Sequence, residues 1–134
     1  MDPIYLTAKE LGALNAASLQ DTVQESTVRS ASALDSIIAQ PQQVFFSTEA
    51  YPTAEKKLGI VFLKIITLHP FEDGNKRTAV LALAVLAKLN HYRITYTNSE
   101  LAALTLKIAA ADGPDIDYDA LYKNLRVHLA PANN

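Results

Sequence analysis

The chain has 134 residues, 49% of them hydrophobic and 19% charged, which is the balance of a globular domain and not of a disordered chain. It contains no cysteine, which excludes disulfides, zinc–thiolate sites, iron–sulfur clusters and a cysteine nucleophile. Twelve Lys and Arg against 14 Asp and Glu give a net charge of −2, too weak a field to attract nucleic acid or an anionic membrane. The longest apolar run, residues 79–87, is far shorter than the roughly 20 residues that span a bilayer, and no secretion signal opens the sequence. We therefore expect one cytoplasmic domain over residues 1–134.

Helix start and stop signals predict a mostly helical chain. Capping boxes at Thr7 and Thr97, each with glutamate three residues later, open two helices, and Asp117 caps a third. In chain order, the predicted helices cover about residues 7–17, 32–40, 51–68, 75–89, 97–110 and 117–129. Between them we expect a polar loop at 20–29, a β-prone stretch at 44–46, a short extended strand at 92–96 and a frayed tail at 131–134.

Two of these helices, 51–68 and 75–89, have apolar residues nearly all round, as is typical of buried central helices. The expected fold is therefore an all-α, compact bundle of five to six helices with a short β-like flap. The connection between the two central helices is the segment with the most chemical groups. It reads His69-Pro70-Phe71-Glu72-Asp73-Gly74-Asn75-Lys76-Arg77.

Read by its chemistry, this loop resembles a phosphate-binding site. Gly74 precedes a helix whose N-terminus exposes unpaired N–H groups and the positive end of the helix dipole. Lys76 and Arg77 add positive charge in the first turn, where the dipole disfavours cations unless an anion is bound. Asp73 offers an oxygen ligand for Mg²⁺, and His69 is a natural general base near neutral pH. Each residue alone has a structural explanation, but their conjunction favours a site.

The nine residues match every defined position of the signature loop of the Fic/Doc family, H-P-F-x-D/E-G-N-G/K-R. The segments 28–42, 45–52 and 89–93 are also similar to the Doc (death-on-curing) toxin branch of that family. Arg29 and Arg93 lie in these segments, and no chemistry is assigned to them.

The resemblance implies an all-α fold that transfers part of ATP, with Mg²⁺, to a Ser, Thr or Tyr hydroxyl of a protein. Carried over by position, His69 is expected to be the base, Asp73 to hold Mg²⁺ and Phe71 to anchor the loop in the core. The phosphate-binding residues are expected to be Gly74, Asn75, Lys76 and Arg77, with Asn75 also fixing phosphate or the loop. A flap that aligns the target by strand addition is expected at Val44, Phe45, Phe46 and Ser47, within residues 44–50. The alternative for that segment is an apolar loop packed on the core.

Two departures from the family pattern bear on the reaction. Members that transfer AMP usually have Gly where this chain has Lys76, and a second Arg where it has Val80. The Doc branch shares the lysine and resembles kinases, so the resemblance favours transfer of the γ-phosphate over transfer of AMP. A third reading is a catalytically idle module that binds phosphate without turnover.

Many family members inhibit themselves with a helix of pattern S/T-x-x-x-E-G/N. None of the six glutamates of this chain has Ser or Thr four residues earlier. The resemblance therefore implies a toxin controlled in trans by a small antitoxin partner. Elongation factor Tu is the target that the Doc branch implies.

Overall fold

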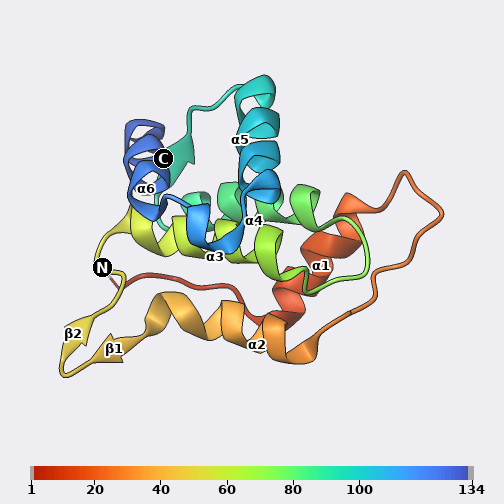
Figure 1. The fold of residues 1–134 in the computed structure, drawn as a ribbon, viewed down its shortest axis with the longest axis horizontal. Helices are drawn as coiled ribbons and strands as arrows, with labels where there is room; N and C mark the ends of the chain where they lie inside the picture. The colour runs from red at the N-terminus through yellow and green to blue at the C-terminus, as the bar shows by residue number, and fades with distance from the viewer. Residues whose placement is uncertain (1, 133–134) are drawn as a thin grey trace.

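The computed structural model describes residues 2–132, and within them it confirms the all-α fold class. Six α-helices are accompanied by two short 3₁₀ turns and two small antiparallel sheets of two strands each, of which only β1–β2 is a hairpin (Figure 1). The helices are α1 (Ala8–Ser18), α2 (Ala31–Ala39), α3 (Ala54–Leu68), α4 (Asn75–Leu89), α5 (Asn98–Ala110) and α6 (Tyr118–Val127). The strands are β1 (Val44–Phe45), β2 (Thr48–Glu49), β3 (Tyr92–Ile94) and β4 (Leu129–Pro131), and the 3₁₀ turns are Gln40–Gln42 and Gly113–Asp115.

The helix caps explain most of these boundaries. The Thr7 hydroxyl accepts a hydrogen bond from the Glu10 N–H at 3.1 Å, and the Glu10 carboxylate accepts one from the Thr7 N–H at 2.9 Å. Thr97 makes the same reciprocal pair at the start of α5, as the sequence predicted. The prediction for α2 was wrong by one or two residues, because its cap is Ser30 and not Ser32. A bond from the Ser30 N–H to the Pro70 carbonyl holds the cap in its extended conformation.

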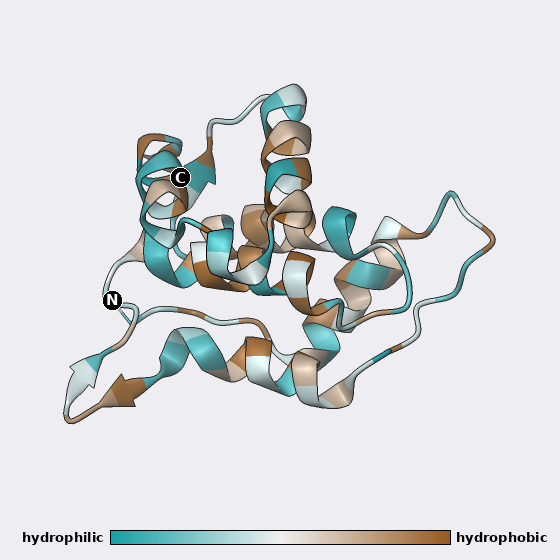
Figure 2. Ribbon diagram, viewed as in Figure 1, coloured by the Kyte–Doolittle hydropathy of each residue, from teal (hydrophilic) through white to brown (hydrophobic). Residues whose placement is uncertain are grey.

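The core is built around α3 and α4, which pack against each other along their lengths. In α3, nine of the 15 residues are buried, in agreement with the prediction of a central helix. The other helices cover this pair: α1 packs on α4, and α2, α5 and α6 pack on α3. One connected cluster of buried apolar side chains includes residues from all six helices. Figure 2 shows brown, hydrophobic bands both on the central helices and on the helices that cover them.

The C-terminal part of the described chain is more ordered than expected. The predicted strand at 92–96 forms β3 over Tyr92–Ile94, and it pairs with β4. The last helix therefore ends at Val127, and Leu129 begins a strand instead of ending a helix. The prediction of a frayed tail was wrong for Pro131 and for residue 132, whose N–H donates to the His91 carbonyl at 2.9 Å. Residues 133–134 lie outside the described residues.

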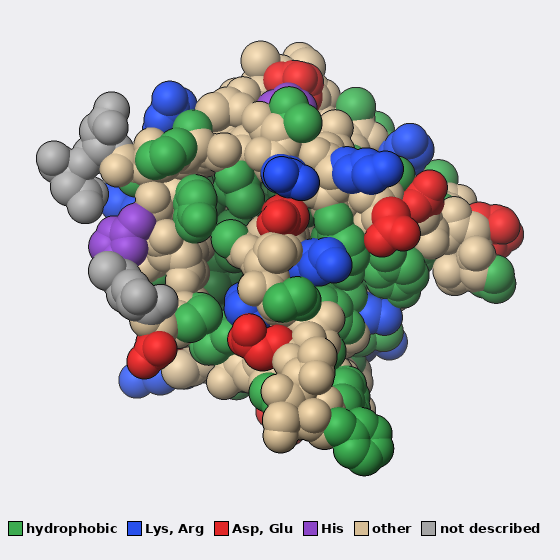
Figure 3. Space-filling view, turned by 90° about the vertical axis from the view of Figure 1, so that its left-hand side faces the viewer, with side chains coloured by type: hydrophobic (Ala, Val, Ile, Leu, Met, Phe, Trp, Pro, Cys, Tyr) green, Lys and Arg blue, Asp and Glu red, His purple; other side chains and the backbone are tan. Residues whose placement is uncertain are grey.

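The hairpin β1–β2 projects from the N-terminal end of α3. Its two tip residues, Phe46 and Ser47, adopt positive φ angles of 51° and 67°, and the Phe46 side chain is fully exposed. The base is tied to the core by Lys57, whose ammonium group lies 3.0 Å from a Glu49 carboxylate oxygen. In Figure 3, which faces the left-hand side of Figure 1, hydrophobic side chains lie along the right-hand side of the lower protrusion. Within residues 2–132, no helix has the length and apolar character needed to cross a membrane.

Candidate active site

The loop between α3 and α4 borders an open pocket of about 420 Å³. The structure brings His69 into this pocket together with Asp73 and the first residues of α4. The full lining is Leu19, Thr22, Gln24, His69, Glu72, Asp73, Gly74, Asn75, Lys76 and Arg77. Six of the predicted site residues therefore share one cavity, and the α1 end and the loop after it close its other side.

His69 occupies the first position after α3, in a left-handed conformation with φ 48° and ψ 64°. Few residues other than glycine adopt this conformation, because Cβ approaches the following carbonyl oxygen. The turn ends the helix abruptly, so that His69 is exposed while Pro70 and Phe71, which follow it, are buried. An imidazole is thus held at the rim of the pocket.

The N-terminus of α4 faces the same pocket. Its cap residue is Gly74, with φ 75°, and no side chain makes a capping hydrogen bond there. The N–H groups of the first turn are therefore left to other partners, and the dipole places positive charge at this end. Lys76 and Arg77 are exposed in that turn. One guanidinium nitrogen of Arg77 donates to the Ser18 carbonyl at 3.2 Å, which fixes the direction of its side chain.

Gly74 is required by packing as well as by its backbone conformation. A Cβ atom built on it would lie 2.7 Å from the Ser18 hydroxyl oxygen and 3.1 Å from a Leu19 methyl carbon. The space that a side chain would need is therefore filled by the end of α1 and the residue after it. This close approach brings the end of α1 against the start of α4.

The Asn75 side chain fixes the loop in this structure. Its carbonyl oxygen accepts the Phe71 N–H at 3.1 Å, and its amide nitrogen donates to the Phe71 carbonyl at 2.8 Å. Phe71 itself is fully buried and Asn75 is 9% exposed. Asn75 can thus offer the pocket its backbone N–H, while its amide group is engaged with the loop.

A further buried amide, which the sequence analysis did not single out, supports the loop from α1. Asn15 donates to the Asp73 carbonyl at 2.8 Å and to the Thr78 hydroxyl at 3.1 Å, and it accepts from the Ser26 hydroxyl at 2.6 Å. Thr78 in turn donates to the Gly74 carbonyl at 2.8 Å. The sequence does contain one sign of this role: Asn15 lies four residues after Leu11 and therefore on the same buried face of α1, where a polar residue is unusual.

The predicted polar loop 20–29 ends in a strap over residues 26–30 that runs beside the loop of His69. Val28 forms an isolated antiparallel bridge with Phe71, and the Glu72 N–H donates to the Thr27 carbonyl at 2.9 Å. Arg29 contributes its backbone N–H to Pro70 and its guanidinium to two further carbonyls. The backbone of residues 68–74 is therefore held from both sides.

Charged groups of both signs line the pocket. Lys76 and Arg77 balance Glu72 and Asp73, so the cavity itself is close to neutral. Among the described residues there is no group of three or more His, Cys, Asp or Glu side chains that could hold a metal ion. Mg²⁺ with phosphate needs only one or two carboxylates from the protein, and the exposed Asp73 provides one beside the N-terminus of α4.

The structure does not bring the hairpin to this pocket. None of the four residues predicted as the flap, Val44, Phe45, Phe46 and Ser47, lines it. The hairpin precedes α3 and the His69 loop follows it, and the two lie on opposite sides of the molecule in Figure 1. Because α3 has 15 residues, its ends are about 21 Å apart. The alternative prediction for this segment, an apolar loop packed on the core, is also wrong, because Val44, Phe45 and Phe46 are exposed.

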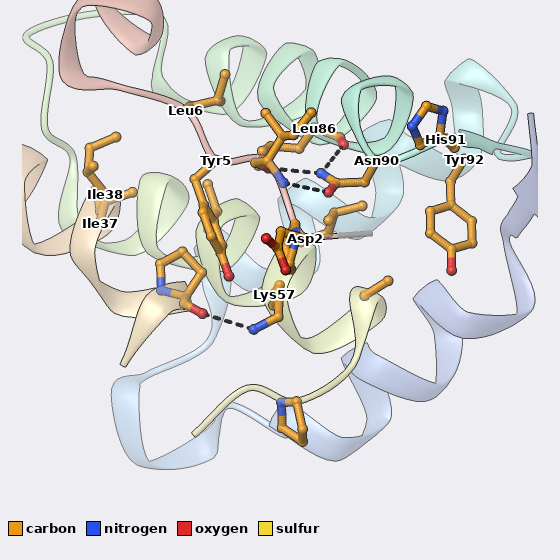
Figure 4. A pocket seen from close by; sticks show the side chains of 17 residues that line it. Asp2, Tyr5, Leu6, Ile37, Ile38, Lys57, Leu86, Asn90, His91 and Tyr92 are labelled. Carbon is orange, nitrogen blue, oxygen red and sulfur yellow. Dashed lines mark hydrogen bonds between the residues drawn. The ribbon is translucent and has the colours of Figure 1, made fainter. Parts of the chain in front are cut away.

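A second cavity of about 310 Å³ lies near the other end of α3 and is mainly apolar (Figure 4). Residues 2–6 cross it, and two hydrogen bonds between Ile4 and the Asn90 amide, of 2.8 and 2.9 Å, hold them there. Lys57 is one of the residues that line this cavity. Burial alone would lower the pKa of this lysine, but its hydrogen bonds to Glu49 and Tyr5 raise the pKa above its usual range. The charge of this lysine is already paired with Glu49, and no other Lys or Arg is among the described residues that line the cavity.

Comparisons with known proteins identify the family of the chain. A family model described as "Fic/DOC family" matches residues 5–87, which include the strap, the loop and both central helices up to residue 87. The chain therefore belongs to the Fic/Doc family. Over 66 residues it is 33% identical to a protein named Toxin Doc from Mycolicibacterium smegmatis (strain ATCC 700084 / mc(2)155). That match covers 49% of this chain and 51% of the relative, so the chain spans about half the length of the curated relative it matches. The resemblance to the Doc branch is thus confirmed.

Proposed function

We propose that this protein transfers the γ-phosphoryl group of ATP to a hydroxyl group of a protein target. The observation that carries the proposal is that an exposed imidazole and an uncapped helix N-terminus with two cations face one pocket. Members of the Fic/Doc family are typically transferases that act on proteins, which supports the reaction class.

In the proposed step, His69 accepts the proton of the target hydroxyl. The hydroxyl oxygen forms a bond to the γ-phosphorus, the bond to the bridging β–γ oxygen breaks, and ADP leaves. The first-turn N–H groups of α4, with Lys76 and Arg77, bind and orient the phosphates and stabilise the charge that develops on them. Asp73 would hold Mg²⁺, which neutralises phosphate charge when bound.

Lys76 supports phosphoryl transfer over AMP transfer. It adds charge and bulk in the first turn of α4, where the AMP-transferring pattern has glycine. Val80, one turn further along α4, provides no cation for a distal phosphate. We infer that the nucleotide lies with its terminal phosphate beside His69. AMP transfer to Ser, Thr or Tyr remains the alternative.

Incubation with ATP labelled at either the α- or the γ-phosphate separates these reactions. We expect the protein to transfer label to a protein of a bacterial extract, with purified elongation factor Tu as the first candidate, from the γ-position only. Label from the α-position alone would establish AMP transfer instead. Nucleotide binding in calorimetry without any transfer would identify an idle phosphate-binding module.

The chain offers a matched pair of histidines for the control. His69 and His91 are both exposed and both have positive φ, at 48° and 68°, which asparagine tolerates better than most residues. His69→Asn should lower transfer about 10²- to 10⁴-fold, the usual contribution of a general base. His91→Asn should retain activity. A fully active His69→Asn variant excludes His69 as the base.

The relative named Toxin Doc also supports a role as the toxin of a toxin–antitoxin pair. We propose that a small antitoxin encoded beside this protein inhibits it in trans. Expression of the protein alone should arrest growth, and co-expression of the neighbouring small gene should restore it. Harmless expression at high level, with the protein folded, contradicts the toxin role.

A further inference from the structure

The end of α3 is closed by a side chain from the strap of residues 26–30. The Arg29 guanidinium donates through Nη2 to the Leu68 carbonyl at 2.6 Å and through Nε to the His69 carbonyl at 2.7 Å. The backbone N–H of the same residue donates to the Pro70 carbonyl at 2.8 Å. Three successive carbonyls around His69 therefore accept hydrogen bonds from one residue, about 40 positions earlier in the chain.

These bonds oppose two costs at this point. The last carbonyls of a helix have no partner within it, and the negative end of the dipole lies there, so a bound cation is favourable. In addition, His69 occupies the left-handed position that glycine usually takes, at a cost of about 1–2 kcal/mol. Charge-assisted bonds to the carbonyls on both sides of the His69 Cα stabilise this turn over a continued helix. A continued helix would rotate the imidazole away from its present direction.

We propose that Arg29 is the positioning residue for His69: it locks the left-handed turn that presents the imidazole to the pocket. The inference rests on the proposed function in taking His69 as the base. Arg29 does not itself line the pocket, and two nitrogens of its guanidinium are engaged with carbonyls. It therefore acts through the backbone of His69 and not by contact with the nucleotide.

The geometry also predicts that lysine cannot replace this arginine. Nε and Nη2 form a planar fork whose spacing suits two neighbouring carbonyls, whereas an ammonium group is a single flexible point donor. Arg29→Lys keeps the charge near the end of α3 and loses the fork. It therefore separates the positioning effect from simple electrostatics, and it perturbs folding less than Arg29→Ala.

The experiment compares Arg29→Lys with Arg93→Lys. Arg93 is an exposed arginine on β3, which follows the C-terminal end of α4, whereas the His69 pocket lies at the N-terminal end of that helix. In Arg29→Lys, kcat for phosphoryl transfer should fall by about 10²-fold, the usual effect of displacing a reacting group by about 1 Å. The KM for ATP should change less than about threefold, because the proposed phosphate-binding residues lie at the start of α4. Arg93→Lys should leave both constants unchanged.

A second measurement needs neither nucleotide nor activity. The imidazole resonances of His69 in the free protein, assigned with the His69→Asn variant, should shift and broaden in Arg29→Lys, while those of His91 and His128 stay in place. Unchanged His69 resonances, or a kcat that stays within about threefold of the wild type, overturn the positioning role. Wild-type protein that transfers no phosphate refutes the proposed function alone, and the resonances then decide whether Arg29 positions His69.

Discussion

Replacement of Gly74 by alanine tests the packing that places the start of α4. The glycine has φ 75°, where an L-residue costs about 1–2 kcal/mol. The new Cβ would also lie 2.7 Å from the Ser18 hydroxyl oxygen, a contact closer than Cβ atoms tolerate. Overpacking of this kind typically costs about 1–3 kcal/mol. The two effects together predict a loss of about 2–5 kcal/mol in the free energy of unfolding.

The measurement is chemical and thermal denaturation followed by circular dichroism. For a chain of this length, such a loss lowers Tm by roughly 7–18 °C. Gly12→Ala is the matched control, since Gly12 lies inside α1 and a Cβ atom added there would meet no atom within 4 Å. Alanine there should stabilise the protein by about 0.5–1 kcal/mol.

A double substitution separates the two contributions. In a Gly74→Ala background, Ser18→Ala removes the hydroxyl oxygen that the new methyl group meets, so part of the lost stability should return. The backbone strain remains in the double variant. Surface substitutions commonly change stability by up to about 0.5 kcal/mol. If Gly74→Ala changes the free energy of unfolding by no more than that, this reasoning is refuted.

Two further predictions concern one buried and one half-buried polar side chain. Asn15→Leu removes the donor to the Asp73 carbonyl, and each buried polar group left unsatisfied costs about 1–3 kcal/mol. Urea denaturation should therefore show that the free energy of unfolding falls by about that amount or more. Unchanged stability contradicts a structural role for the amide. Burial, with the charge of Glu100, raises the pKa of Tyr96 from 10.0 to about 12. Its protonated form is thus favoured in the folded state, and the free energy of unfolding should fall as the pH rises from 10.0 to about 12. Tyr96→Phe should flatten that decline in alkaline denaturation curves, and an equally steep decline contradicts the assignment.

The helices were predictable because their signals are local. The bounds of α4 agree with the prediction, since Gly74 precedes it and an apolar pattern continues up to Asn90. The capping boxes at Thr7 and Thr97 likewise mark α1 and α5 by hydrogen bonds within four residues. Both partners of each pair are close together in the chain, so the sequence alone reports them.

The features that the sequence did not reveal depend on partners far along the chain. Arg29 bonds to carbonyls about 40 residues away, and Asn15 to one 58 residues away, and no periodicity in the sequence reports such pairs. The pairing of β4 with β3 is non-local in the same way. The distance of the hairpin from His69, in contrast, could have been predicted from the sequence. A 15-residue helix lies between the two segments and places them about 21 Å apart.

Both ends of the described chain meet at residues 90–91, just beyond α4. The Asn90 amide binds the backbone of Ile4 in both directions, and the His91 carbonyl accepts the N–H of Ala132. The His69 pocket lies at the opposite end of the same helix, about 21 Å away. A fluorophore or a tether attached beside Ile4 or Ala132 would therefore lie on the side remote from the pocket and would not obstruct it.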